Sequence, residues 1–261
     1  MPPDMLTLRA GDASIAVSHD GGRLASLRVG DLELLVTEGD KPSRWGSFPM
    51  VPWCGRLAGG RLTLDGASHD FPLTRPPHAL HGLAHLQPWR AVDANTLRTE
   101  LVDPWPWPAH VLQRFELSRD ALTVTLEVHA ERTPMPAMAG WHPWFRRRLA
   151  RGDEARVHVD AALAYVVDET KIPTGELVPP PAPPWDLCFR DVRGDPRIEW
   201  PDALSLTLSS TFDHWVVFTE PEHALCVEPQ SGPPNEPNSA PRMVRPGEPL
   251  VGSMTLRWTR A

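Results

Sequence analysis

Apolar and polar residues alternate along several stretches of this 261-residue chain, and no other feature limits its fold as strongly. In Ala121–Ala130 (ALTVTLEVHA) leucine and valine occupy every second position, and Ala203–Ser209 (ALSLTLS) repeats the pattern. Side chains two residues apart lie on the same face of a β-strand, so both stretches are predicted to be half-buried strands. Further strands are expected at Ser14–Ser18, Gly22–Val29, Arg61–Leu64, His110–Leu117, His214–Phe218, Ala224–Glu228 and Ser253–Trp258.

Proline and glycine separate these stretches. The chain has 31 prolines, many of them between apolar runs, where they prevent a helix from continuing. Arg61–Phe71 is predicted to form a hairpin that turns at Asp65 and Gly66. The proline-rich stretch Val178–Trp185 (VPPPAPPW) is interpreted as a stiff surface loop. We therefore expect an all-β fold, a large antiparallel β-sandwich with few short helices, in a single domain over residues 1–261.

Charge and cysteine content restrict the partners. The formal net charge is −7 and no run of Lys or Arg stands out, which argues against nucleic acid and against an anionic membrane surface. The first residues do not resemble a signal peptide, and no apolar stretch approaches the ~18 residues of a membrane span. Three cysteines, an odd number, favour free thiols in a reducing compartment. We expect a cytoplasmic monomer or homodimer.

Three segments interrupt the strand pattern by placing ionisable side chains among apolar or rigid neighbours. His81 precedes a glycine, His142 stands among aromatic residues, and Glu228 ends an apolar run before a proline-rich loop. A single buried histidine is more often structural than catalytic, so only the combination is informative. The segments are Ala79–Trp89 (ALHGLAHLQPW), Ala139–Arg146 (AGWHPWFR) and Cys226–Asn238 (CVEPQSGPPNEPN).

Together these segments resemble the signature segments of the aldose 1-epimerase (galactose mutarotase) family, in the same order along the chain. The closing stretch Arg245–Trp258 (RPGEPLVGSMTLRW) also resembles the end of that family, so the similarity runs from about residue 10 to the C-terminus. Val51–Leu57 (VPWCGRL) is similar to its arginine-bearing segment, although Gly55 stands where the family usually has Asn. The resemblance implies a galactose mutarotase-like supersandwich that interconverts the α and β anomers of a hexose without a cofactor.

The resemblance also implies roles for individual residues. Glu228 is expected to be the general base that takes the proton of the anomeric hydroxyl, and His142 the general acid at the ring oxygen. Apolar neighbours favour a raised pKa for Glu228, and a nearby carboxylate is expected to keep His142 protonated. His81 is expected to hydrogen-bond the sugar and polarise it. No metal is required.

Four further residues are expected to bind the sugar. Arg56 and Asp213 match substrate-binding positions of the family, offering forked donors and acceptor oxygens to hydroxyl groups. Trp141 and Trp144 flank His142, and an indole is a suitable platform for the C–H face of a sugar ring. The expected partner is therefore a small-molecule sugar.

Three alternatives remain open from the sequence. A non-catalytic carbohydrate-binding module would keep the tryptophans without needing an acid–base pair. A hexose-6-phosphate 1-epimerase would use arginines for the phosphate. A metalloenzyme of the cupin type would combine His81, His85 and Glu228 as metal ligands. The arginines considered for phosphate are Arg44, Arg75, Arg146 and Arg147.

Overall fold

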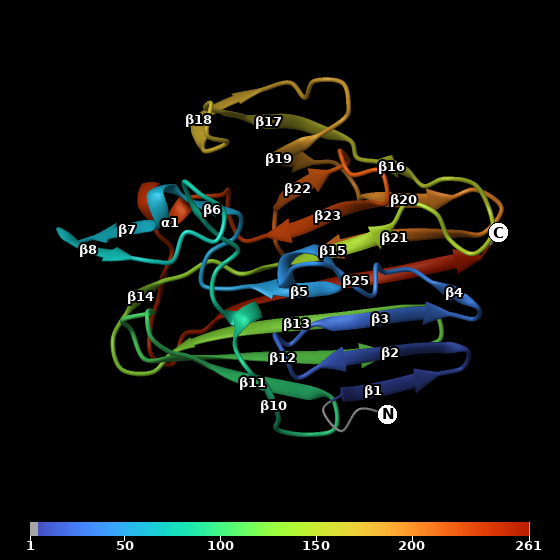
Figure 1. Ribbon diagram of the computed structural model, residues 1–261, viewed down its shortest axis with the longest axis horizontal. Helices are drawn as coiled ribbons and strands as arrows, with labels where there is room; N and C mark the ends of the chain where they lie inside the picture. The colour runs from blue at the N-terminus through green and yellow to red at the C-terminus, as the bar shows by residue number, and fades with distance from the viewer. Residues whose placement is uncertain (1–4, 261) are drawn as a thin grey trace.

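A computed structural model describes residues 5–260, and two large sheets make up most of it (Figure 1). The first sheet has eleven strands, each hydrogen-bonded to its neighbours in antiparallel fashion. In order across it lie β1 (Met5–Ala10), β2 (Ala13–Ser18), β3 (Leu24–Val29), β5 (Ser47–Met50), β15 (Gly140–Arg146), β23 (Ala224–Gln230), β22 (His214–Phe218), β19 (Asp186–Val192), β17 (Ala161–Val167) and β18 (Pro173–Val178), with β4 (Leu32–Glu33) paired to β3.

The second sheet has eight strands and is also antiparallel. Its order is β10 (Arg90–Ala91), β11 (Thr96–Leu101), β12 (Ala109–Leu117), β13 (Ala121–Ala130), β25 (Leu250–Arg260), β21 (Leu204–Ser210), β20 (Arg197–Trp200) and β16 (Arg156–His158). Three two-stranded ribbons complete the strands: β14 (Met135–Pro136) with β24 (Met243–Val244), β6 (Arg56–Leu57) with β9 (Ala79–Leu80), and β7 (Arg61–Leu64) with β8 (Ala67–Asp70).

The two large sheets pack face to face and share one hydrophobic core. Buried side chains of both sheets belong to the same cluster, among them Leu27 and Phe145 from the first sheet and Leu126 and Leu256 from the second. The indole Nε1 of Trp141 on β15 donates to Gln113 Oε1 on β12 at 3.0 Å, which ties the sheets across this core. The predicted all-β fold, a large antiparallel sandwich, is confirmed.

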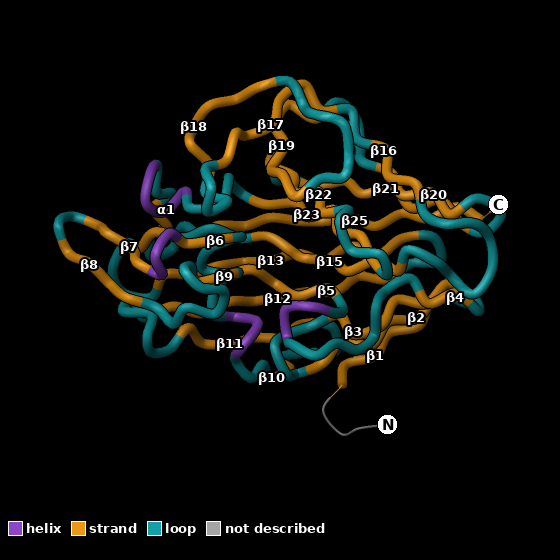
Figure 2. Tube along the Cα trace, turned by 45° about the horizontal axis from the view of Figure 1, so that its top comes forward, coloured by secondary structure: helices purple, strands orange, loops and turns teal. Residues whose placement is uncertain are grey.

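Helices are few and short, as Figure 2 shows in purple. The α-helix α1 spans Glu236–Ser239, and three 3-10 turns cover Pro42–Arg44, Ala58–Gly60 and Ala84–Leu86. Within residues 5–260 no helix has the length and apolar character needed to cross a membrane. The turn at Ala84–Leu86, α1 and the ribbon β6–β9 all belong to the connections that carry the polar segments noted in the sequence.

The strands expected from alternation are present, and the predicted Ala121–Ala130 coincides with β13. The hairpin turning at Asp65 and Gly66 is β7–β8, and Val178–Trp185 is a loop apart from its first residue, which ends β18. Alternation did not predict β5 (SFPM) or β15 (GWHPWFR). Every residue of β5, and six of the seven in β15, are buried, so their two faces do not differ in polarity.

Candidate active site

The centre of the candidate site is a row of side chains across the first sheet. Gly140 pairs with Gln230 and Trp144 with Cys226, so His142 on β15 stands opposite Glu228 on β23. On the other side of β15, His142 pairs with Phe48 of β5. Directly paired residues of antiparallel strands point to the same face, only ~4.5–5.5 Å apart at Cβ. The sheet register therefore brings a base and an acid candidate together from segments that are distant in sequence.

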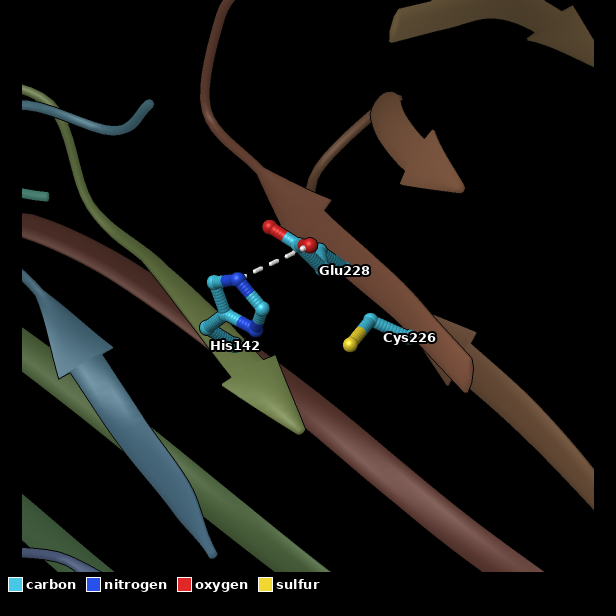
Figure 3. Close-up of side chains that lie close together, drawn as sticks. All are labelled: His142, Cys226 and Glu228. Atoms are coloured by element: carbon cyan, nitrogen blue, oxygen red, sulfur yellow. Dashed lines mark ion pairs between the residues drawn. The ribbon is translucent and has the colours of Figure 1, made fainter. Parts of the chain in front are cut away.

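The imidazole of His142 and the carboxyl group of Glu228 are in contact (Figure 3). Nε2 of His142 lies 3.3 Å from Oε1 of Glu228, and both side chains are almost completely buried. Oε2 of Glu228 accepts a hydrogen bond of 3.3 Å from Nε2 of Gln230. Nδ1 of His142 is buried and has no hydrogen-bond partner among residues 5–260.

Burial shifts the pKa of both groups in the direction that favours the uncharged form of each. Desolvation, with a smaller effect of the Asp186 charge, raises the pKa of Glu228 well above its usual range. Desolvation, with smaller effects of His85 and Arg23, lowers the pKa of His142 to about 3. The sequence led us to expect that a nearby carboxylate keeps His142 protonated, and burial opposes this. Burial therefore favours the neutral arrangement of the pair, a protonated Glu228 beside a neutral His142.

His81 reaches the same face from the loop that follows β9. Its ring centroid lies 4.8 Å from that of His142, in an edge-to-face arrangement. The backbone N–H of His81 donates to the carbonyl of Gly55 at 2.8 Å, and the residue adopts a left-handed φ of 62°. A Cβ at Gly82 would lie 2.1 Å from the carbonyl oxygen of Val51, so only glycine fits after His81. The HG pair thus places the imidazole beside His142.

Arg56 meets an acidic residue that the sequence did not single out. Its guanidinium Nη2 lies 3.6 Å from Oδ2 of Asp186, at the start of β19, and Nζ of Lys171 lies 3.5 Å from the same oxygen. Gly55, which precedes Arg56, has a φ of 61°, and a Cβ there would stand 2.8 Å from Cγ of Pro234. Glycine at this position therefore permits the close approach of the Pro234 loop.

These groups line a cavity of about 550 Å³ on the face of the first sheet that points away from the second. Its volume lies within the ~300–1,000 Å³ typical of small-molecule sites. The lining includes Arg56, His81, His142, Trp144, Asp186 and Glu228.

The two tryptophans beside His142 point to opposite faces of β15, and only one reaches the cavity. The Trp144 ring lies parallel to the His142 imidazole, at 6° and 5.2 Å between centroids, with His223 stacked on the indole's other side at 6.1 Å. Trp141 is buried between the sheets, where it bonds Gln113. The expectation that Trp141 stacks on the sugar is therefore corrected, because the strand pleat turns it into the core.

Asp213 also lies outside the cavity. Its side chain is 70% exposed, and Oδ1 is 2.7 Å from Nδ1 of His214. Nε2 of His214 is in turn 3.1 Å from the hydroxyl of Tyr165. Asp213 borders a separate surface depression with Trp215. The acidic side chain that lines the cavity beside Arg56 is Asp186.

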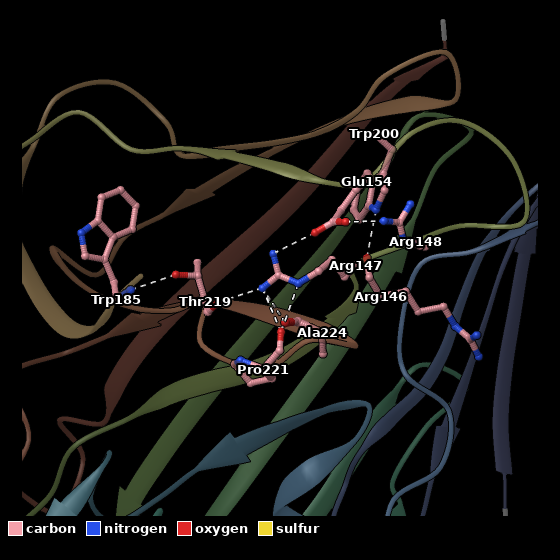
Figure 4. A network of polar contacts seen from close by, with 9 residues as sticks. All are labelled: Arg146, Arg147, Arg148, Glu154, Trp185, Trp200, Thr219, Pro221 and Ala224. Carbon is pink, nitrogen blue, oxygen red and sulfur yellow. Dashed lines mark hydrogen bonds and ion pairs between the residues drawn. The ribbon is translucent and has the colours of Figure 1, made fainter. Parts of the chain in front are cut away.

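Arg147 does not line the cavity but holds one of the loops that do. The guanidinium of Arg147 donates to the backbone carbonyls of Thr219, Pro221 and Ala224 at 2.8 to 3.2 Å (Figure 4). The loop held in this way, residues 220–223, lines the cavity. Arg146 donates to the carbonyl of Leu35, so neither of these two arginines faces a ligand. Of the arginines considered for phosphate, Arg44 and Arg75 line the cavity.

The metal set of a cupin-type enzyme does not form. Among residues 5–260, His81, His85 and Glu228 do not bring their donor atoms together into one cluster. The His85 imidazole instead packs on Phe48, at 5.0 Å between ring centroids. The sequence spacing of the two histidines therefore reflects how the loop folds onto Phe48.

Comparison with known proteins identifies relatives of this chain. The sequence model of the aldose 1-epimerase family matches residues 4–257. The Escherichia coli K12 protein YphB is 25% identical over 293 aligned positions, which cover 96% of this chain and 97% of YphB. Galactose mutarotase from Rattus norvegicus is 30% identical over 149 positions, covering 51% of this chain and 42% of the rat protein.

The fold comparison extends over the whole chain. A crystal structure of a galactose mutarotase-like protein from Clostridium acetobutylicum superposes with a TM-score of 0.85 at 18% identity, covering 98% of this chain and 95% of that one. This likeness shows the fold, and the match of the sequence model over nearly every residue shows the family. The chain belongs to the aldose 1-epimerase family.

Proposed function

We propose that this protein is an isomerase that interconverts the α and β anomers of an aldohexose by opening and reclosing the sugar ring. The observation that carries the proposal is the contact of 3.3 Å between Nε2 of His142 and Oε1 of Glu228 on the floor of a sugar-sized cavity. Anomer exchange moves one proton from the anomeric hydroxyl to the ring oxygen and back. It therefore requires a pair of groups that shares one proton and faces both oxygens.

Glu228 acts as the base and His142 as the acid in this proposal. A sugar bound in the cavity over the two side chains accepts a hydrogen bond from His142 at its ring oxygen and donates one to Glu228 from its anomeric hydroxyl. The proton of the pair then resides on His142, because hydrogen bonds to the carboxylate and the positive charge of Arg56 favour the ionised form of Glu228, which burial alone disfavours. Glu228 takes the proton of the anomeric hydroxyl while His142 gives its proton to the ring oxygen, which breaks the C1–O5 bond and leaves the open aldehyde. Rotation about the C1–C2 bond, followed by the reverse proton transfers on reclosure, produces the other anomer.

Three further residues position the sugar. His81, beside His142, supplies a hydrogen-bonding imidazole near the reacting end, and desolvation together with the charges of His142 and His85 lowers its pKa, so it acts in its neutral form. Asp186 and Arg56 present acceptor and donor groups to the other hydroxyls. Trp144 contributes an aromatic side chain to the cavity lining and fixes the orientation of the His142 ring by stacking on it.

Cations at the rim favour a second candidate, the exchange of anomers of a hexose 6-phosphate. Lys41 and Arg75 line the cavity, and neither forms an ion pair with another residue in the part of the chain from 5 to 260. Arg44 lines it as well and is bound to Asp40 at 3.1 Å. Exposed cations that line a sugar cavity would bind a phosphate group.

Anomer exchange measured by polarimetry and by NMR tests the proposal. Freshly dissolved single anomers of a panel of hexoses and their 6-phosphates are compared with and without protein. We expect at least one of them to equilibrate well above its spontaneous rate. Binding of a sugar without faster exchange would instead support a non-catalytic carbohydrate-binding module.

A matched variant separates the two substrate candidates. Arg75→Ala removes a rim cation without touching Glu228 or His142. It should raise KM for the 6-phosphate and leave KM for the free hexose unchanged if the phosphate is recognised. If the KM for each substrate is the same in the variant as in the wild type, the result favours the free sugar.

A further inference from the structure

A third side chain with a metal-binding atom stands beside the proposed acid–base pair. Sγ of Cys226, the imidazole of His142 and the carboxyl group of Glu228 lie within 4.8 Å of one another, and all three residues are buried. Figure 3 shows the three side chains converging. Cys226 precedes Glu228 by two residues on β23, so the strand pleat places both on the cavity face.

The donor set is one that zinc prefers. Zn²⁺ binds thiolate, imidazole and carboxylate groups in tetrahedral geometry, with ~2.3 Å to sulfur and ~2.0–2.1 Å to nitrogen and oxygen. A nitrogen and an oxygen ligand at those distances stand about 3.3 Å apart, by the tetrahedral angle. Nε2 of His142 and Oε1 of Glu228 are 3.3 Å apart. Hard cations such as Mg²⁺ and Ca²⁺ prefer oxygen ligands alone.

We propose that His142, Cys226 and Glu228 bind one Zn²⁺ ion, and that zinc bound there competes with the sugar. The thiol of Cys226 and the carboxyl group of Glu228 release their protons, and His142 donates a lone pair from Nε2. Two protons leave as one divalent cation enters, so the net charge of this buried site does not change. Three protein ligands leave the fourth position open toward the cavity, as in a zinc site accessible to a ligand.

The competition follows from shared atoms. Bound zinc occupies the lone pairs of Nε2 of His142 and of a Glu228 oxygen, the same atoms that the proposed function assigns to proton transfer. Only this inhibitory part rests on the proposed function. The binding part rests on the positions of the three donor atoms.

Zinc titration by calorimetry, with chelator-buffered Zn²⁺, tests the binding part directly. We expect one ion per chain, and no comparable binding of Mg²⁺. Cys226→Ala should weaken zinc binding about 100-fold or more, since even residues behind the ligands commonly contribute ~10–100-fold. Cys188→Ala is the matched control, because Cys188 is also a buried thiol and lines the cavity beside His142 and Glu228 but lies outside the cluster. It should leave the affinity unchanged.

X-ray absorption at the zinc edge of the wild-type protein keeps the test independent of how the variants fold. It should show one sulfur ligand at ~2.3 Å beside lighter atoms. A shell without sulfur, an absence of binding, or an equal loss in Cys188→Ala would overturn the site.

Polarimetry at fixed zinc concentrations tests the inhibition. We expect zinc to raise the apparent KM for the sugar with kcat unchanged, and a chelator to restore the rate. Zinc that binds through Cys226 without slowing exchange would overturn the competition and leave the binding site standing. A protein without anomer exchange would overturn the proposed function, and the calorimetry would still decide the site.

Discussion

The central strands of the two large sheets differ in what lies against the face that points away from the shared core. In the eight-stranded sheet, buried and half-buried residues alternate along β13, because one face packs on the core and the other faces solvent. In the eleven-stranded sheet, all seven residues of β23 and six of the seven in β15 are buried. Their second face forms the floor of the cavity. Polar groups on this floor are desolvated, which costs folding free energy and shifts their pKa values, as is typical of functional sites.

The largest expected effect is on the free energy of unfolding, when apolar volume is removed from the eight-stranded sheet. Leu126 of β13 is fully buried in the core. Leu126→Ala should lower the free energy of unfolding by about 2–5 kcal/mol, through lost burial and the cavity left behind. Denaturant titration measures this, and kcat at a temperature where the variant is folded should stay unchanged. A large loss of kcat would mean that the two sheets are not separable in function.

Replacing Glu228 on the cavity floor is expected to stabilise the fold, whereas Leu126→Ala destabilises it. Its folded-state pKa is raised above the unfolded value, so its contribution to stability is complete below about pH 4.5 and is lost as pH rises. Glu228→Gln cannot ionise and should become more stable than wild type above pH 4.5, by about 1.4 kcal/mol per pH unit up to the folded pKa. Thermal unfolding from pH 4 to 8 measures the difference, and equal pH profiles would contradict the burial argument.

His85 tests the same principle with a base in place of an acid. Desolvation and the charge of Arg23 lower its pKa to about 3, so between pH 6.5 and 3 the unfolded chain binds a proton that the folded chain does not. His85→Asn should remove about 1.4 kcal/mol per pH unit from the acid-side loss of stability in that window. Leu126→Ala is the control, since it should shift the whole profile without changing its slope. An unchanged slope in His85→Asn would show that this imidazole is hydrated.

The smallest effect is expected on the outer face of the alternating sheet. Oγ1 of Thr123 and Oγ1 of Thr255 lie 2.9 Å apart across β13 and β25. Cross-strand pairs of this kind contribute roughly 0.2–1 kcal/mol, so Thr123→Val should change the free energy of unfolding by less than about 1 kcal/mol at every pH. Chemical denaturation resolves this, and a loss comparable to that of Leu126→Ala would mean that the face is not solvent-facing.

The contrast also explains what the sequence could predict. Alternation predicts β13 and β21 because it records a difference between two faces, and Asp65-Gly66 predicts a hairpin because the turn requires that backbone. No alternation exists in SFPM or GWHPWFR, where both faces are buried. In β15, which holds the proposed acid, the sequence signal is instead a histidine among aromatic residues together with the family resemblance, and β5 has no such signal.

Two residues show where the sequence reasoning on the site stopped. The pleat alone separates Trp141 from His142 and Trp144, so treating GWHPWF as a strand would have placed Trp141 in the core. Asp186 had a weaker signal, a single acidic residue directly after the proline-rich loop at the beginning of a strand. Its contact with Arg56 depends on how β19 lies beside β22, which no local pattern records.

The kinetics of Glu228→Gln test the central claim most directly. Glutamine keeps the shape of the side chain but cannot accept the proton of the anomeric hydroxyl, and general base catalysis typically contributes ~10²–10⁴-fold in rate. Polarimetry on the best substrate should show kcat reduced by about that factor with KM little changed. His142→Asn should lose a similar factor, and the double variant little more than the worse single one. Arg56→Ala should raise KM instead. Turnover of Glu228→Gln near the wild-type rate would contradict this account.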